Sequence, residues 1–352
     1  MVIRRPILIA ALALLLAVVA IAPAHAQPPR GPAREIIQVT PDLYRARNGN
    51  WYAMFLVTPA GVILSDPINP DFATWLKGEI ETRFKQPVRY VVYSHSHWDH
   101  AAGGAVFEGT AKFVAHENMR RNMDGRYPHM PGDMWDRNDN GVIDPDEISI
   151  PTTTWPGICG LGPNSFAQMD RNKDGRIPPQ ELMADIRRPD IFYSDRMRID
   201  LGGKTVELIH PGLNHSDDAT VMYFPSERVV FATEFLADAL VTTSMRSMPS
   251  ACGAFDGHPM AEWIKSYRTV EALDFDTLIP GHGALFKKAD VVEARQYFED
   301  LRAEVSAGMA AGKSLEELKK TITLAKYKDW AYFERLREAN IAAAYTNLKN
   351  HP

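Results

Sequence analysis

The 352-residue sequence predicts an α/β sandwich that is interrupted by an inserted module and followed by C-terminal helices. Three observations support this fold class. Segments with the apolar pattern of strands fall into two groups, one before residue 123 and one after residue 190. The stretch between the groups is rich in Pro, Gly, Asn and Asp. After the last strand pattern, apolar residues recur with helical spacing.

The first group of strands lies in the first half of the sandwich, which we place at residues 27–122. Residues 35–47 and 51–67 have strand patterns, and residues 59–61 form a turn within the second. Residues 71–85 predict a helix that has one apolar face, formed by Phe72, Leu76, Ile80 and Phe84. A buried strand at residues 88–95 follows. Residues 111–123 begin as a strand and end as a helix.

The second group resumes the sandwich over residues 191–312. Strand patterns occupy residues 196–211, 219–235 and 276–283, and residues 287–309 predict a helix. Residues 314–349 predict further helix, which starts at a capping box from Ser314 to Glu317. The division is therefore an inserted module at residues 123–190 and a helical extension at residues 313–352.

Residues 1–26 have the parts of a secretory signal peptide: basic Arg4 and Arg5, an apolar run at residues 7–22, and small residues up to Ala26. The alternative is a membrane anchor, but the run is shorter than the ~20 residues of a spanning helix. We expect cleavage after Ala26 and a periplasmic or secreted protein. The Arg pair leaves both the general secretory route and the twin-arginine route open.

The composition is globular, with 45% hydrophobic and 24% charged residues. The formal net charge of −5 becomes more negative when Arg4 and Arg5 are removed, which argues against nucleic-acid binding. We expect a small-molecule substrate and no membrane attachment after cleavage, and the oligomeric state stays open. Cys159 and Cys252 permit one disulfide in an oxidising compartment, but their separation is unknown, so bonded and free thiols both remain possible.

A histidine-rich segment, "HSHWDH", directly follows the buried strand at residues 88–95. Imidazole and carboxylate groups are ligands for zinc-type metals. His95 and His97 alternate along an extended segment, so they point the same way and can share one ion. A turn after them would direct Asp99 and His100 to a second ion. Two ions a few ångströms apart can lower the pKa of a bound water toward ~7.

This segment resembles the H-x-H-x-D-H signature of the metallo-β-lactamase superfamily. The resemblance continues in "HPGLNHSDD", which supplies His215, and in "LIPGHGAL", which supplies His282. At the end of a strand between them the family has a bridging Asp, or Cys in some lactamases. Here "VVFATEF" places Glu234 at that position, and Asp238 is an alternative ligand four residues later.

The resemblance implies an αββα fold that holds two zinc ions. His95, His97 and His215 would hold the first ion, and the second would be held by Asp99, His100 and His282, with Glu234 at or near the bridge. Asp99 would be the catalytic side chain that orients a metal-bound hydroxide. The implied function is an exported zinc-dependent hydrolase that cleaves a carbonyl ester or amide, such as a β-lactam or lactone.

Other readings of these residues stay open. A lactonase, thioesterase or phosphoesterase would use the same ligands, iron could replace zinc in an oxidoreductase, and an inactive scaffold could serve only to bind calcium. Asp66 occupies the position of a family Asp that supports the His cluster, or is a turn residue. His116 and His210 are expected to be structural, whereas His258 lies in an irregular segment that could contact substrate.

Two segments within the inserted module match the EF-hand calcium loop, with Gly at the sixth position of each. The first, residues 136–147, offers Asp136, Asn138, Asn140, the carbonyl of Val142, Asp144 and Glu147. The second, residues 170–181, offers Asp170, Asn172, Asp174, the carbonyl of Arg176 and Glu181. Position nine is Pro178, so a water must serve there. We therefore expect two calcium ions.

The calcium loops predict a structural role for the inserted module. The Pro-rich linker between them permits only short helices, unlike a calcium sensor, whose helices swing open. Ile143 and Ile177 stand at the eighth positions, where paired loops contact each other. We hypothesise that the module packs beside the active site, and that a Cys159–Cys252 bridge would tie it to the segment that carries His258.

Overall fold

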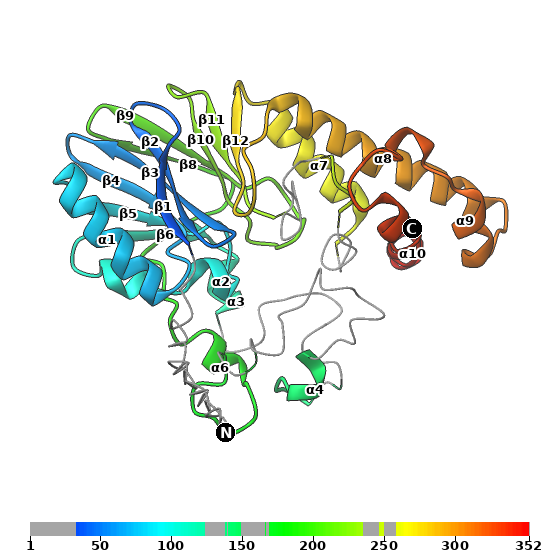
Figure 1. Cartoon of the computed structure of the whole chain (residues 1–352), viewed down its shortest axis with the longest axis horizontal. Coiled ribbons are helices and arrows are strands. Elements are labelled where there is room, and N and C mark those ends of the chain that lie inside the picture. The colour runs from blue at the N-terminus through cyan, green and yellow to red at the C-terminus, as the bar shows by residue number, and fades with distance from the viewer. Residues whose placement is uncertain are drawn as a thin grey trace, which may run out of the picture.

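In the computed structural model, the residues described are 33–123, 138, 140–148, 166, 169–234, 246–249 and 258–351. They form a mixed α/β fold of two β-sheets with helices, which agrees with the predicted fold class (Figure 1). No helix in these ranges is long and apolar enough to cross a membrane. Asp136, Cys159, Asp238 and Cys252 lie outside the described residues, so the disulfide and the alternative ligand stay predictions.

The first sheet has seven strands in sequence order, β1 to β7. Strands β1 to β4 are antiparallel, and β4 to β7 are parallel. Their bounds are β1 Arg34–Gln38, β2 Leu43–Asn48, β3 Trp51–Thr58, β4 Gly61–Ser65, β5 Val88–Val92, β6 Lys112–His116 and β7 Ile191–Tyr193. Strand β1 has only partly exposed and exposed residues, β2 mixes buried with partly exposed residues, and β4 is wholly buried.

Helix α1 (Pro70–Phe84) provides the crossover between the parallel strands β4 and β5. Its start follows from capping, because the Asn69 side chain accepts a hydrogen bond from the Phe72 N–H and Pro70 stands at the first helical position. Phe72, Leu76 and Ile80 are buried, as the helical spacing predicts. The short elements α2 (Trp98–Ala101), the 3-10 helix η1 (Gly104–Phe107) and α3 (Met119–Asn122) follow β5 and β6.

The second sheet has five strands in the order β12-β11-β10-β9-β8. Its strands are β8 Arg196–Leu201, β9 Lys204–Ile209, β10 Val221–Phe224, β11 Val229–Phe231 and β12 Thr277–Ile279. The first four are antiparallel neighbours, and β12 runs parallel to β11. Helix α7 (Met260–Glu271) lies between β11 and β12 in the chain and was not expected from the sequence. Its period buries Trp263, Tyr267 and Val270.

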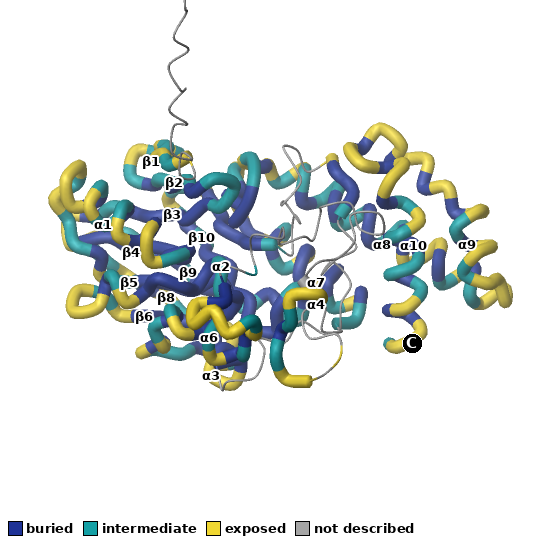
Figure 2. The backbone as a smooth tube through the Cα atoms, turned by 60° about the horizontal axis from the view of Figure 1, so that its bottom comes forward, coloured by how far each residue is buried: buried dark blue, intermediate teal, exposed yellow. Residues whose placement is uncertain are grey.

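Three apolar clusters show the layering. One lies between the sheets and joins Met54 and Val92 to Phe224 and Phe231. A second joins the outer face of the first sheet to α1, and a third joins the second sheet to α7 and the C-terminal helices. The order is therefore helix, sheet, sheet, helix. Figure 2 shows the strands as mostly buried, with exposed residues on the outer turns of the helices.

The C-terminal extension has three helices: α8 (Lys288–Ala310), α9 (Leu315–Thr321) and α10 (Phe333–Asn350). The capping box at Ser314 and Glu317 is present in the structure. The helical pattern predicted at residues 314–349 is interrupted by η2 (Ala325–Tyr327), because Leu324 and Tyr332 adopt left-handed backbone conformations at φ 46° and 62°. Helices α8 and α10 contact each other, and their buried apolar residues belong to the third cluster.

The calcium-loop segments are described in part. Gly141 and Gly175 both have φ 84°, the left-handed conformation that the loop pattern requires at its sixth position. Ile143 and Ile177 form an antiparallel β-bridge with two N–H···O bonds of 3.0 Å. The helices that follow each loop, α4 (Pro145–Ile148) and α6 (Pro179–Leu182), have four residues each.

Candidate metal centre

Segments that follow different strands converge at one edge of the two sheets. His95, His97, Asp99 and His100 follow β5 and continue into α2. His215 lies in the loop between β9 and β10, while Glu234 follows β11 and His282 follows β12. Because β5, β11 and β12 all end at this edge, residues up to 187 positions apart in the chain become neighbours only after folding.

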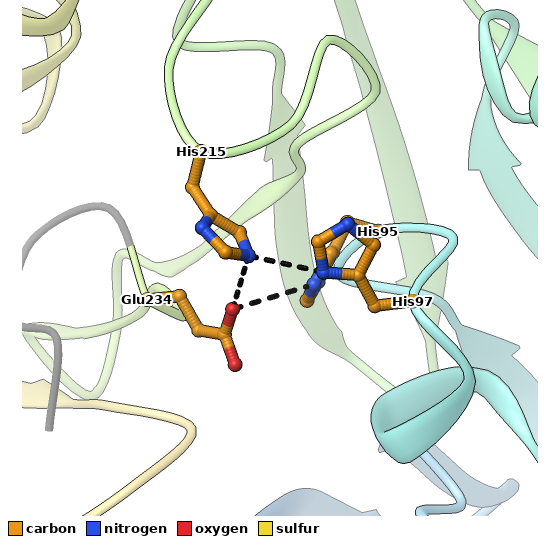
Figure 3. A group of neighbouring side chains, drawn as sticks. All are labelled: His95, His97, His215 and Glu234. Atoms are coloured by element: carbon orange, nitrogen blue, oxygen red, sulfur yellow. Dashed lines mark hydrogen bonds and ion pairs between the residues drawn. The ribbon is translucent and has the colours of Figure 1, made fainter. Parts of the chain in front are cut away.

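The first group consists of His95, His97, His215 and Glu234, whose potential ligand atoms all lie within 4.8 Å of one another (Figure 3). His97 Nδ1 is 3.0 Å from His215 Nε2. Glu234 Oε2 forms an ion pair with His215 Nε2 and lies 3.7 Å from His95 Nε2. The four side chains point toward a common centre and come from three separate segments.

The second group consists of Asp99, His100, Glu234 and His282, also within 4.8 Å of one another. Glu234 Oε1 is 2.9 Å from the Nε2 atoms of both His100 and His282. The two imidazole Nε2 atoms are 3.1 Å apart, and Asp99 Oδ2 is 3.7 Å from His100 Nε2. His100 and His282 are buried, whereas the Asp99 side chain is 23% exposed and marks the open side.

Glu234 is the residue that the two groups share. Its Oε1 faces the second group and its Oε2 faces the first, so one carboxylate can serve both. Its backbone has φ 49°, a left-handed conformation that a non-glycine residue rarely adopts and that costs about 1–2 kcal/mol. The structure thus holds this side chain between the two groups, despite a cost in backbone strain.

Burial and neighbouring charges shift the titration of these side chains. Burial, with His97 alongside, lowers the pKa of His95 well below its ordinary value. Burial and the neighbouring His215 lower the pKa of His97 to about 4. Burial opposes ionisation of Glu234, but His215 and hydrogen bonds from His100 and His282 lower its pKa well below the usual range. At neutral pH His95 and His97 are therefore neutral imidazoles beside an ionised Glu234 carboxylate.

These side chains fit a divalent ion. Within the described part of the chain, the buried Nε2 of His95 has no hydrogen-bond partner, and the pairs of ring nitrogens face each other across about 3 Å. Two imidazole ring nitrogens turned toward one another at this distance need a proton or a cation between them. Nitrogen and carboxylate oxygen donors are the set that zinc prefers.

Asp66 supports His100 from behind. This fully buried carboxylate places Oδ2 3.2 Å from His100 Nδ1, and its Oδ1 accepts a hydrogen bond from the Ser94 N–H at 2.8 Å. Although burial opposes the charged form, Asp99, Asp66 and Glu234 raise the pKa of His100 well above its ordinary value. An ion at Nε2 would use the same orientation, with the other ring N–H donated to Asp66.

The sequence analysis considered three more histidines, which lie outside the two candidate groups. His116 stacks on His210 with ring centroids 3.9 Å apart, and His116 Nε2 donates to the Ser194 carbonyl at 2.7 Å. His258 is half-buried, and its carbonyl accepts a hydrogen bond from Asn347 at 2.8 Å. Burial lowers the pKa of His258, and the neighbouring Asp217 opposes this. A substrate contact of His258 stays a prediction.

Trp51 is a site residue that the sequence analysis missed. Its indole Nε1 donates a hydrogen bond to Asp99 Oδ2 at 3.1 Å, and its ring meets the His282 ring edge-on at 5.2 Å between centroids. No motif marks this tryptophan. Its place follows from the pairing of the β3 start with the segment after β12, where Tyr52 N–H donates to the Gly281 carbonyl at 2.8 Å.

In the second calcium-loop segment, side-chain oxygens accept hydrogen bonds from backbone N–H groups of the same loop. Asp170, Asn172 and Asp174 accept hydrogen bonds from backbone N–H groups further along the loop, and Glu181 accepts one from Asn172 N–H at 3.0 Å. In the first segment, Glu147 accepts from the N–H groups of Asn138 and Asp144. Asn140 Oδ1 also accepts a hydrogen bond from the Val142 N–H at 3.0 Å, in a similar turn.

Comparison with known proteins identifies a family and related folds. A family model described as "Metallo-beta-lactamase superfamily" matches residues 83–282, more than half of the chain. A curated relative, 2,4-dinitroanisole O-demethylase subunit alpha from Nocardioides sp. (strain JS1661), is 25% identical over 231 residues, which are 63% of this chain and 49% of the relative. The chain therefore spans about half the length of that relative.

Two solved structures align with this chain, and the first is similar in fold. The sec-alkylsulfatase Pisa1 from Pseudomonas sp. aligns with a TM-score of 0.62 at 14% identity, over 91% of this chain and 51% of that chain. A metallo-beta-lactamase from Pontibacter korlensis aligns with a TM-score of 0.49 at 15% identity, over 76% of this chain and 99% of that chain. At such identities the likeness concerns the fold.

Proposed function

This chain belongs to the metallo-beta-lactamase superfamily, and we propose that it is a hydrolase that uses two divalent ions, most naturally zinc, to cleave a small-molecule substrate. One observation carries the proposal: two groups of four potential ligands lie side by side and share Glu234. Superfamily members are typically metal-dependent hydrolases. The buried His95 nitrogen without a hydrogen-bond partner in the described chain supports a cation there.

Bound ions would supply Lewis acidity, which activates water and polarises the bond to be cleaved. The chain's own residues divide the remaining tasks. His95, His97 and His215 form a face of ring nitrogens, and Glu234 provides negative charge to both groups. Asp99 stands at the open side with a partly exposed carboxylate, so we assign to it the orientation of the attacking water and the acceptance of its proton.

We propose a carbonyl ester or amide as the first substrate class, with β-lactams and lactones as members. A sulfate ester is the second candidate, supported by the similarity in fold to an alkylsulfatase over 91% of this chain. The 25% identical O-demethylase subunit supports adding a nitroaryl methyl ether to the substrates tested. Each candidate requires attack by water on an electrophilic centre between the two groups.

The test is turnover by the mature protein, residues 27–352, after chelation and after reloading with zinc. The substrates are nitrocefin, a γ-lactone, p-nitrophenyl acetate, a secondary alkyl sulfate and a nitroaryl methyl ether. Turnover that chelation abolishes and zinc restores supports the proposal, and the substrate that reacts identifies the class. A protein that contains two zinc ions but hydrolyses only the alkyl sulfate would overturn the carbonyl assignment. A protein that binds no zinc would overturn the metal centre itself.

We also propose that the two loop segments bind calcium and act as a structural staple. Support comes from the loop patterns, the Ile143–Ile177 bridge and the contact of this region with the metal-centre helix. There Gly103 N–H donates to the Asp185 carbonyl at 2.8 Å, and Ala102 bridges to Ile186, directly after α2. Calcium should raise the melting temperature and slow proteolysis. Asp174→Ala should abolish half of the bound calcium, and an unchanged calcium content would contradict the proposal.

We propose export through the N-terminal segment, whose 1–32 range lies outside the described residues. Its basic start, apolar run and small-residue exit support this proposal. The test is fractionation of expressing cells, followed by mass spectrometry of the N-terminus. A periplasmic or secreted chain that begins at Gln27 is expected. A cell-associated chain that still begins at Met1 would contradict cleavage.

A further inference from the structure

The side of the metal centre that carries Asp99 has a supporting residue of its own. In the second group, His100 is held by the buried Asp66, and His282 follows a buried strand. Asp99 has no such burial, because its side chain is 23% exposed and it lies in the four-residue helix α2. A partly exposed carboxylate can occupy several rotamers, so a separate contact must select the one that faces the centre.

That contact is the indole of Trp51. Its Nε1–H donates to Asp99 Oδ2 at 3.1 Å, and Oδ2 is also the oxygen nearest to His100 Nε2, at 3.7 Å. Among the described residues, no second side chain donates a hydrogen bond to this carboxylate. The same indole ring meets the His282 ring at an interplanar angle of 66°. One side chain therefore touches two of the four members of the second group.

The Trp51 side chain is itself well anchored. Trp51 begins β3, pairs with Asn48 of β2, and forms a backbone bridge with His282 on its other side. Its ring packs against the apolar cluster of the first sheet. The sheet and the apolar cluster therefore fix the position and orientation of the Trp51 ring. A residue that supports a metal ligand needs to be held rigidly in this way.

We propose that Trp51 is a positioning residue for the second ion: its N–H fixes the Asp99 carboxylate toward the centre, and its ring fixes the plane of His282. The proposal rests on the two-ion function proposed above. It assigns Trp51 no contact with substrate and no role in the first group, because the hydrogen bond and the ring contact of its indole both go to members of the second group. The effect of losing Trp51 should therefore be confined to the second ion.

The experiment uses Trp51→Phe, which keeps an aromatic ring beside His282 and removes the N–H. Trp75→Phe is the matched control, because Trp75 is another half-buried tryptophan that packs against the same cluster but lies on α1, away from the centre. The zinc-free forms of wild type and both variants are titrated with zinc against a chromophoric chelator. The affinity of each successive ion is measured, together with the melting temperature of the zinc-free forms.

Loss of a supporting residue typically weakens metal binding by roughly 10–100-fold. We expect that loss for the second ion in Trp51→Phe, with first-ion affinity within about 2-fold of wild type and Trp75→Phe unchanged. An unchanged second-ion affinity in Trp51→Phe would overturn the role of Trp51 alone. Equal weakening of both ions, matched by Trp75→Phe, would show a general packing effect and also overturn it. A wild-type chain that binds no second ion would overturn both this inference and the two-ion function.

Discussion

Replacing Glu234 by Asp is the sharpest test of the shared carboxylate. The substitution shortens the side chain by one methylene, so the carboxylate retreats by about 1.5 Å. In the wild-type chain Oε1 is 2.9 Å from two Nε2 atoms, those of His100 and His282, and Oε2 contacts the first group. Zinc–oxygen bonds tolerate errors of only ~0.2 Å. A shorter carboxylate cannot reach both groups from the same backbone position.

We expect Glu234→Asp to weaken the binding of at least one ion by about 100-fold, or about 3 kcal/mol. The metal-free protein should lose stability along with the buried contacts to the histidines, and Asp offsets part of this loss because it tolerates a left-handed backbone better than Glu. Zinc titration against a chelator and thermal unfolding of the metal-free protein separate the two effects. Glu234→Gln is the control, since it keeps the length and removes the charge. Wild-type affinity for both ions in Glu234→Asp would refute the bridging geometry.

Three further predictions concern the surroundings of the site. A Cβ at Gly281 would lie 2.9 Å from His100 Cε1, so Gly281→Ala should destabilise the protein by about 1–3 kcal/mol. Gly78 lies on α1 with open space around it, so Gly78→Ala should instead stabilise the protein by about 0.5–1 kcal/mol. Urea unfolding measures both changes. Asp66→Asn should weaken one zinc by roughly 10–100-fold in chelator competition, and equal affinity would contradict its support of His100. In the folded chain the pKa of His97 is lowered to about 4, below its ordinary value of about 6.5. As the pH falls from 6.5 to 4, the unfolded metal-free chain therefore binds a proton at His97 before the folded chain does, and the free energy of unfolding decreases. His97→Gln should remove up to about 3 kcal/mol of that loss, and an identical pH dependence in the variant would argue against a buried neutral His97.

Much of the candidate site could be predicted from the sequence because its densest part is local. His95, His97, Asp99 and His100 lie within six residues, and a strand followed by a tight turn can direct them to one place. His215 and His282 needed the family resemblance, since nothing in their own segments specifies the partner that they approach. The sandwich also followed from local signals, because strand periodicity and the helical spacing of residues 71–85 each depend on residues close together in the sequence.

The remainder depends on contacts between distant segments. That Glu234 serves both groups follows from its left-handed backbone and from the meeting of β11 with β12, neither of which has a periodic signal. Trp51 reaches Asp99 because β3 starts beside the segment that carries His282. Helix α7 (Figure 1) does have an apolar period, formed by Trp263, Tyr267 and Val270, but the irregular sequence before it gives no clear helix start.

The parallel pairing of β6 and β7 constrains how this chain can have evolved. Val114 pairs with Ile191 in the same direction, so the backbone leaves β6 at the metal-centre edge and must return to the opposite edge before β7 begins. Some connection of a dozen or more residues is therefore compulsory at this point, whatever its content. An ancestor could exchange a plain crossover for a longer segment without altering the register of either sheet. Each such exchange would begin beside the ligands, so a change in the crossover would also change the approach to them.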